Sequence, residues 1–279
     1  MKTRQTRRRF ASALVVLAAF TTLSLEVGCT DAAQPESKLE SILSSQTLRV
    51  GTTGDFMPFS YRRDDAGNLR GVDIEFARRL ATHMGVDIEF VHTSWPELSD
   101  DLLADRFDVG LSGITITPER MTVAFFSDPV MSSGKVAIAR DEDAHRFRSI
   151  GEIDRPGVRV IVNPGGTNEA FAREHFPQAT IILNDENLTV FEKIVAGVAD
   201  VMVTDAAEAA VQEVIRPELE VSNPDTPFNH FEFGMLLPRD QALKDFIDSW
   251  LDEQERDRTY QQLFDAELIE IEAALSGDN

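Results

Sequence analysis

Segments with the composition of β-strands alternate with segments of helical periodicity along most of this chain. In its first half, strand-like runs lie at residues 47–53, 87–94 and 107–113, and helix-like segments lie at 71–85 and 95–106. The links are short, and Gly85 is well placed to end the first helix. Such alternation predicts a parallel sheet covered by helices on both faces.

The same alternation restarts in the second half of the chain. Strand-like runs lie at 135–140, 158–166, 180–185 and 201–205, and helix-like segments lie at 167–176, 188–197 and 206–215. A strand and a helix at 231–240 and 241–254 are expected to return to the first sheet. We therefore predict two α/β lobes with a ligand cleft between them, because ligands in such folds bind beyond the carboxyl ends of the strands.

Residues 1–28 have the layout of an export signal peptide. A basic start containing Arg7, Arg8 and Arg9 precedes the short apolar run at 10–20, which fits the general export route or the twin-arginine route. Cys29 follows directly and is the only cysteine, so no intramolecular disulfide can form. We predict an exported, periplasmic protein that is either soluble or anchored by a lipid at Cys29.

The charge and the missing motifs exclude several classes of partner. The formal net charge is −21, which argues against nucleic acid and against anionic membrane surfaces. An anionic ligand must therefore be held by a few local cations. The five histidines are scattered without the spacing of metal ligands, and the chain has no phosphate-binding loop and no GxGxxG motif. We predict neither a metal nor a cofactor.

The segment at 112–120 is a candidate carboxylate site. A strand ends at Ser112 and Gly113, and Thr117 and Pro118 suit the N-cap and the first residue of a helix that carries Arg120 in its first turn. An arginine beside unpaired backbone N–H groups can clamp a carboxylate. The alternative is a solvent-facing arginine that pairs with Glu119 or another acid.

Aromatic residues follow two strand ends. Phe56 and Phe59 lie in GDFMPFSYR, and Trp95 lies in TSWPEL. Such side chains either line a cleft and contact an apolar ligand or pack in the core, and core packing is favoured for Phe59.

The turn at 162–172, VNPGGTNEAFA, is suited to an anion. Two glycines turn the chain, and Thr167, Asn168 and Glu169 open a helix whose first N–H groups are free. An acid, Glu169, is unexpected in a site that receives negative charge.

Two further charged residues have open interpretations. Asp205 ends the strand at 201–205, where it either caps the next helix or binds a substrate ammonium. Lys135 lies near the predicted crossing between the lobes, where it either meets a ligand carboxylate or is an exposed hinge lysine.

Together these segments resemble the family 3 periplasmic amino-acid-binding proteins of ABC transporters, over about residues 48–264. A narrower resemblance is to the secreted cyclohexadienyl dehydratases, which share that fold. It is carried by the segments TTGDFMPFSYR, TSWPEL, DRFDVGLSGI, IVNPGGTNEAFAR, TVFEKIVAGVADVMVTDAAEA and LLPRD. The resemblance implies a type II periplasmic-binding-protein-like α/β fold with two lobes joined by a two-strand hinge. It also implies conversion of prephenate to phenylpyruvate, or of arogenate to phenylalanine, with loss of water and carbon dioxide.

The resemblance assigns roles to residues of this chain. It places Arg120 on a substrate carboxylate beside Ser112, Gly113 and Thr115, and it assigns the general acid to Glu169. Thr167 and Asn168 would hold the substrate from the second lobe, and Asp205 matches the ammonium-binding position of the carriers. The chain departs from the family in having Phe56 where a tyrosine is usual, and around Lys135.

A general acid must be protonated when it acts. A helix N-terminus and a nearby Arg120 or Lys135 favour the Glu169 carboxylate, whereas a dry cleft and the carboxylates of the substrate favour the acid form. Because burial and like charge have the larger effects on the pKa, we expect the acid form in the closed complex.

These inferences give the following predicted organisation. A signal peptide at 1–28 and an N-terminal segment at 29–45 precede a discontinuous first lobe at 46–134 and 230–268, a second lobe at 135–229 and an acidic tail at 269–279. The alternative to an enzyme is a non-catalytic periplasmic carrier of an amino acid.

Overall fold

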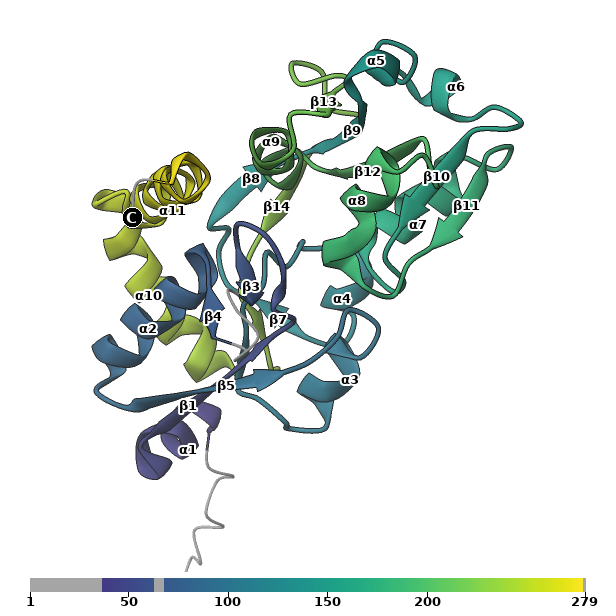
Figure 1. Ribbon diagram of the computed structural model, residues 1–279. Coiled ribbons are helices and arrows are strands. Elements are labelled where there is room, and N and C mark those ends of the chain that lie inside the picture. Colours follow the sequence, from purple (N-terminus) through teal and green to yellow (C-terminus); the bar gives the residue numbers. More distant parts are fainter. Residues whose placement is uncertain (1–36, 63–67, 278–279) are drawn as a thin grey trace, which may run out of the picture. The chain divides into compact units, whose positions relative to one another are not determined.

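The computed structural model describes residues 37–62 and 68–277, and the predicted signal peptide and Cys29 lie outside these ranges. The described residues build two five-stranded sheets, two short sheets and the helices that cover them (Figure 1).

The first sheet has the strand order β5-β1-β6-β15-β7. Its strands are β1 (Thr47–Thr52), β5 (Asp87–His92), β6 (Val109–Gly110), β7 (Phe125–Phe126) and β15 (Leu236–Leu237). β1 is parallel to β5 and β6, with Val50 opposite Phe90 and Val109. The helices of this lobe are α1 (Lys38–Ser45), α2 (Val72–Met84), α3 (Leu98–Leu103), α4 (Pro118–Met121), α10 (Gln241–Arg256) and α11 (Thr259–Ser276).

The second sheet has the order β11-β10-β12-β9-β13. Its strands are β9 (Lys135–Arg140), β10 (Arg159–Val162), β11 (Thr180–Leu183), β12 (Val201–Asp205) and β13 (Leu219–Val221). Its helical segments are α5 (Asp141–Ala144), α6 (Ile150–Ile153), α7 (Thr167–His175), η1 (Asn187–Thr189), α8 (Val190–Val195) and α9 (Ala206–Ile215). Buried apolar side chains form one cluster that includes Val160 and Phe171 and another that includes Ile161 and Phe191, so successive residues of β10 belong to different clusters.

The prediction of parallel sheets is wrong for several strands. β15 runs antiparallel to β6 and β7, and β9 runs antiparallel to β12 and β13. A crossover helix is needed only between consecutive strands that run parallel. The chain enters β9 directly from β8 (Met131–Ser133), without a helix, so β9 is not part of such a parallel unit.

Two short sheets complete the fold. β8 pairs antiparallel with β14 (Phe231–Phe233), as the predicted two-strand hinge requires. We propose that the boundaries of the lobes lie between residues 134 and 135 and between residues 229 and 230. The other short sheet contains β2 (Asp55–Phe56), β3 (Ser60–Arg62) and β4 (Leu69–Arg70).

Local signals in the sequence set several helix ends. Ser37 and Glu40 form a reciprocal capping box at α1, Thr117 caps α4 ahead of Pro118, and Gly85 ends α2 with a left-handed φ of 71°. The predicted helix at 95–106 is shorter, because Pro96 lies in a turn and Asp105 has a φ of 56°. Part of the predicted acidic tail is helical, since α11 extends to Ser276.

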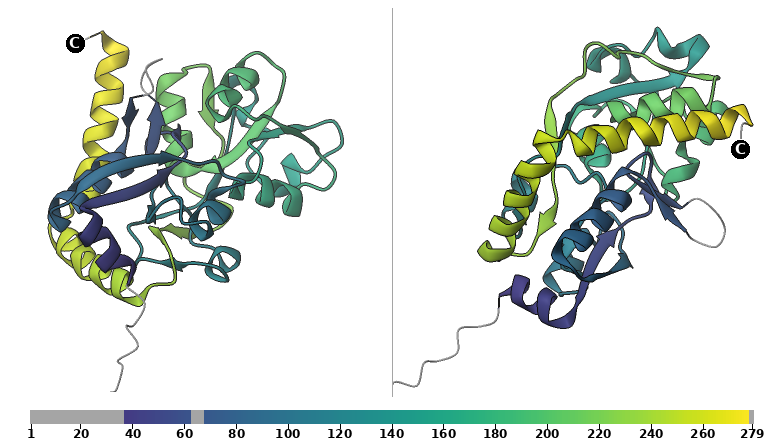
Figure 2. Two further views of the ribbon diagram at one scale, coloured as in Figure 1. Left: turned by 90° about the horizontal axis from the view of Figure 1, so that it is seen from below. Right: turned by 90° about the vertical axis from the view of Figure 1, so that its left-hand side faces the viewer.

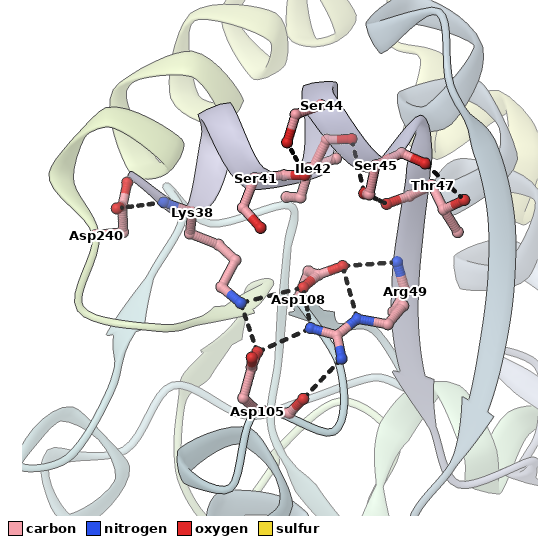
Figure 3. Close-up of polar contacts among 10 residues, drawn as sticks. All are labelled: Lys38, Ser41, Ile42, Ser44, Ser45, Thr47, Arg49, Asp105, Asp108 and Asp240. Carbon is pink, nitrogen blue, oxygen red and sulfur yellow. Dashed lines mark hydrogen bonds and ion pairs between the residues drawn. The ribbon is translucent and has the colours of Figure 1, made fainter. Parts of the chain in front are cut away.

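An ion-pair network fixes α1 to the first sheet (Figure 3). Asp108 accepts hydrogen bonds from the backbone N–H and the guanidinium of Arg49, and Lys38 Nζ lies 2.5 Å from Asp105 Oδ1. The backbone N–H of Lys38 donates to Asp240 Oδ2 over 2.7 Å. These contacts connect α1 to the start of α10 as well as to the loop before β6.

The C-terminal helix α11 contacts elements of both lobes. It packs against α2 and α10 and also against α9, and the second view in Figure 2 shows its full length. Among the described residues, no helix is both long enough and apolar enough to cross a membrane.

Candidate functional site

A small polar pocket is lined by residues that follow strands of both five-stranded sheets. Its cavity volume is about 20 Å³, and it is lined by Phe56, Trp95, Gly113, Thr115, Asn163, Gly166, Thr167, Asn168, Asn187 and Asp205. A volume of this size holds about one water molecule, so the entry of a substrate requires the walls to move apart. Seven of these residues were predicted from the sequence, and they come from segments on both sides of the predicted hinge.

Aromatic rings form one wall of the pocket. The rings of Phe56 and Trp95 meet edge to face with centroids 5.6 Å apart, and Trp95 Nε1 donates to Asp55 Oδ1 over 3.1 Å. Burial raises the pKa of the Asp55 carboxyl. Phe59 is fully buried beside Phe56, which confirms its predicted role in the core.

Hydrogen bonds to neighbouring segments fix the turn at Ser112 and Gly113. Ser112 Oγ lies 2.8 Å from Thr53 Oγ1 and 2.6 Å from Ser60 Oγ. The N–H of Gly113 donates to Asp73 Oδ2 over 2.5 Å, so this donor is not free for a ligand as the sequence interpretation assumed. Gly113 has a φ of 61°, and a Cβ there would lie 2.6 Å from the Phe56 ring. Ser112 is therefore a support of the pocket rather than part of its lining.

Arg120 lies beside this turn with no acidic partner. One guanidinium nitrogen donates to the carbonyl of Thr115 over 2.9 Å, and burial lowers the pKa of the guanidinium. No ion pair involves Arg120 in the described part of the chain, so the alternative of a pair with Glu119 is not supported. A partly buried guanidinium without an ion-pair partner is suited to receive a carboxylate.

Lys135 is buried rather than exposed, with 2% of its surface accessible. Its Nζ donates to Thr167 Oγ1 over 3.0 Å and to Asn168 Oδ1, and it lies 2.5 Å from Asp205 Oδ1. The interpretation of Lys135 as an exposed hinge lysine is wrong. Asp205 is at the N-cap position of α9 but makes no capping hydrogen bond, because its carboxylate is paired with Lys135.

Glu169 does not line the pocket. Its carboxylate accepts a hydrogen bond from the N–H of Gly165 over 2.7 Å and another from Arg173 Nε over 2.7 Å. The hydrogen bond from Gly165 and the charge of Arg173 lower the pKa of Glu169. The ionised form is thus favoured here, and its partners are not the predicted Arg120 or Lys135.

The pKa of Glu208 is shifted in the opposite direction to that of Glu169. Glu208 was not identified as a candidate from the sequence. It is 1% exposed, and burial raises its pKa to about 8, with the charges of Asp205 and Asp55 acting in the same direction. Thr204 Oγ1 donates to Glu208 Oε2 over 2.5 Å and accepts from Asn168 Nδ2 over 3.0 Å. An acidic residue three positions after a strand end, in the segment VMVTDAAEA, is the signal that could have identified it.

Two amide oxygens of the pocket lining have no hydrogen-bond partner within residues 37–62 and 68–277. Asn163 Oδ1 and Asn187 Oδ1 are buried, although Asn187 Nδ2 donates to the carbonyl of Asp55 over 3.0 Å. Buried acceptors are almost always paired, so these two are suited to receive a donor from a ligand. No group of three or more histidine, cysteine, aspartate or glutamate side chains among the described residues could hold a metal.

Comparison with known proteins agrees with this arrangement. Residues 48–266 match the family described as bacterial extracellular solute-binding proteins, family 3. The chain belongs to this family. Both the two-lobed α/β fold and the predicted export to the periplasm agree with the family.

Among its relatives in the family are an enzyme and carriers. The chain is 45% identical over 244 residues to the cyclohexadienyl dehydratase of Pseudomonas aeruginosa, covering 88% of each chain. It is 28% identical over 229 residues to the L-cystine-binding protein TcyJ of Escherichia coli K12, covering 82% of this chain and 85% of the relative.

Similar solved structures likewise include a binding protein and an enzyme. An ancestral amino acid-binding protein, described as a precursor of cyclohexadienyl dehydratase, is 35% identical with a TM-score of 0.76, over 83% of this chain and 99% of the other. An ancestral cyclohexadienyl dehydratase is 47% identical with a TM-score of 0.52, over 83% and 96%.

Proposed function

We propose that this protein is a cyclohexadienyl dehydratase that converts prephenate to phenylpyruvate and arogenate to phenylalanine. The observation that carries the proposal is Glu208, a buried carboxyl whose pKa of about 8 keeps it protonated at neutral pH. A group that stays protonated in a protein interior can act as a general acid. The 45% identity to a dehydratase supports the proposal.

The reaction needs an acid and a carboxylate site. As the ring carboxylate leaves as carbon dioxide, its electron pair enters the ring, the bond from the ring to the hydroxyl oxygen breaks, and the departing oxygen takes a proton to become water. The ring becomes aromatic, which supplies the driving force. Protonation of the leaving group by a positioned acid accelerates such a step by about 10² to 10⁴.

The first lobe would bind the negatively charged carboxylate of the substrate. Arg120 is partly buried and has no carboxylate partner among the described residues, so a substrate carboxylate would pair with it beside Thr115. Thr167 and Asn168 line the pocket from the second lobe. The free oxygens of Asn163 and Asn187 would accept hydrogen bonds from the substrate hydroxyl or from water.

Two glutamates are candidates for the acid. The sequence resemblance assigns the role to Glu169, but hydrogen bonds from Gly165 and Arg173 lower the pKa of this residue. Neither glutamate lines the pocket, but the raised pKa of Glu208 meets the requirement for a proton without any change of environment, and Thr204 and Asn168 connect Glu208 to the pocket lining. We therefore favour Glu208 and keep Glu169 as the alternative.

Asp205 bears on the choice between the two substrates. Arogenate carries an ammonium group that prephenate lacks, and Asp205 already has a cationic partner in Lys135. Turnover of prephenate requires no change in this pair.

A direct assay tests the function. Purified protein is mixed with prephenate at neutral pH, and phenylpyruvate is followed by its absorbance in strong base. The proposal expects steady turnover in the parent and a loss of about 10² to 10⁴ in Glu208→Gln, with Glu169→Gln nearly unchanged. Glu174→Gln, which changes an exposed acid on the same helix as Glu169, is the matched control.

The outcomes separate the candidates. Loss of turnover in Glu169→Gln with an active Glu208→Gln assigns the acid to Glu169. A parent without turnover, stabilised against heat by an amino acid, supports the second candidate function, a periplasmic carrier, which membership of the solute-binding family favours.

We also propose that residues 1–28 are removed on export, with Cys29 either lipidated or free. The mass of the mature N-terminal peptide distinguishes a lipidated Cys29 from an unmodified one.

A further inference from the structure

A second, larger cavity lies away from the polar pocket. Its volume is about 590 Å³, within the range of binding sites for small molecules. Its walls come from α9, from α11 and from the segment Met131–Gly134, which contains the connecting strand β8. α9 and α11 contact one another, and both helices are labelled in Figure 1. The two cavities share no lining residue.

The interior surface of this cavity is mainly apolar. α9 contributes a stripe of alanine and valine side chains that includes Ala210, Val211 and Val214, and α11 contributes Phe264, Leu268 and Ile271. Val214 is 45% exposed although it is a large aliphatic side chain. Apolar surface that helices leave uncovered in this way is stabilised when an apolar molecule covers it.

The charged lining of the cavity is acidic. Glu272 is the acid, His230 is the other ionisable side chain, and no lysine or arginine lines the cavity. Within the described ranges, Glu272 makes no ion pair. The net charge of the whole chain is −21, so its field also repels anions.

We propose that this cavity binds a small molecule with an aromatic or branched aliphatic body and a primary amine. The body packs between the apolar faces of α9 and α11, and the ammonium pairs with Glu272. The site is separate from the proposed dehydratase site, and its existence does not depend on that function.

Three probes of similar size test the proposal: 2-phenylethylamine, 2-phenylethanol and 3-phenylpropionate. Binding to the full chain is measured by titration calorimetry. We expect saturable binding in the order amine, alcohol, acid, with the amine favoured over the alcohol by roughly two- to fivefold, as for an exposed ion pair. The same affinity for all three probes would overturn the proposal.

Variants assign the binding to this cavity. Ala210→Trp fills the cavity from an exposed position on α9 and should abolish saturable binding of the amine. Glu272→Gln should remove the preference for the amine and keep the binding of the alcohol, whereas Glu253→Gln, an exposed acid on α10, should change neither.

Other results contradict the assignment. Retained binding in Ala210→Trp would place the amine elsewhere, and Val214→Lys, which brings a cation to the rim, provides a second test if the tryptophan variant does not fold. A parent that binds no probe and forms a dimer would show that a second copy covers the apolar faces instead.

Discussion

Lys135 Nζ lies 2.5 Å from Asp205 Oδ1, and both side chains are almost completely buried. The two residues are register partners at the ends of the antiparallel strands β9 and β12, so the sheet itself places them opposite one another. Asn168 and Thr167 complete the hydrogen bonds of the ammonium. A buried charge with this many partners is compensated, whereas either charge alone would not be.

Removal of Lys135 should therefore destabilise the fold. We expect Lys135→Met to lower the free energy of unfolding by about 3 to 5 kcal/mol, because it leaves Asp205 buried without a counter-ion. Lys244→Met, which breaks the surface pair with Asp248, should lower it by less than about 1 kcal/mol. Denaturant unfolding measures both values, and Asp205→Asn should recover part of the loss in the Lys135→Met background.

The pKa shifts of two glutamates predict opposite pH dependences of stability. Glu208 keeps its proton in the folded state up to about pH 8, whereas an unfolded glutamate loses it near pH 4.5. Its contribution to stability is thus fully present below pH 4.5 and is lost as the pH rises through 8. Relative to Glu208→Gln, the parent should lose on the order of a few kcal/mol across this window.

Glu169 should behave in the reverse way. Its folded-state pKa lies below 4.5, so its contribution is present above that pH and is lost as the pH falls through the folded-state value. Thermal unfolding of the parent and of both glutamine variants at several pH values measures the two effects. If the stability of Glu208→Gln and that of the parent changed with pH in the same way, the protonation state assigned to Glu208 would be contradicted.

Arg120 should matter for catalysis and not for stability. Arg120→Met removes the proposed partner of the substrate carboxylate and should lower kcat/KM by roughly a hundredfold. The free energy of unfolding should not fall, because the partly buried guanidinium has no carboxylate partner in the described structure. Arg155→Met, at an exposed position, is the control for activity. Equal loss of stability and activity would indicate a structural role.

Gly113 should tolerate alanine less well than another glycine with a similar backbone. Gly197 has a φ of 71°, and a Cβ added there would meet no other group within 4 Å, so Gly197→Ala should lower stability by about 1 to 2 kcal/mol through φ alone. At Gly113 the same substitution also collides with the Phe56 ring. Denaturant unfolding should show the larger loss for Gly113→Ala, and KM should rise only in that variant.

The local sequence determined the parts of this protein that depend on near neighbours. The caps at Ser37 and Thr117 and the end of α2 at Gly85 follow from side chains and backbone angles within a few residues, and the resemblance to the family placed most of the pocket lining. The pair of Glu169 with Arg173 is also local, four residues apart on one helix, although the sequence interpretation did not use it.

Tertiary structure decided which acids and bases are paired. Lys135 meets Asp205 across 70 positions because β9 runs antiparallel to β12, an arrangement that the alternation of strands and helices did not predict. The packing of strands and helices leaves Arg120 without an ion-pair partner among the described residues, and it buries Glu208. A pKa depends on burial and on charges brought together by the fold. The amino-acid sequence therefore supplied candidate acids, and the packing raises the pKa of Glu208 while the contacts of Glu169 lower its pKa.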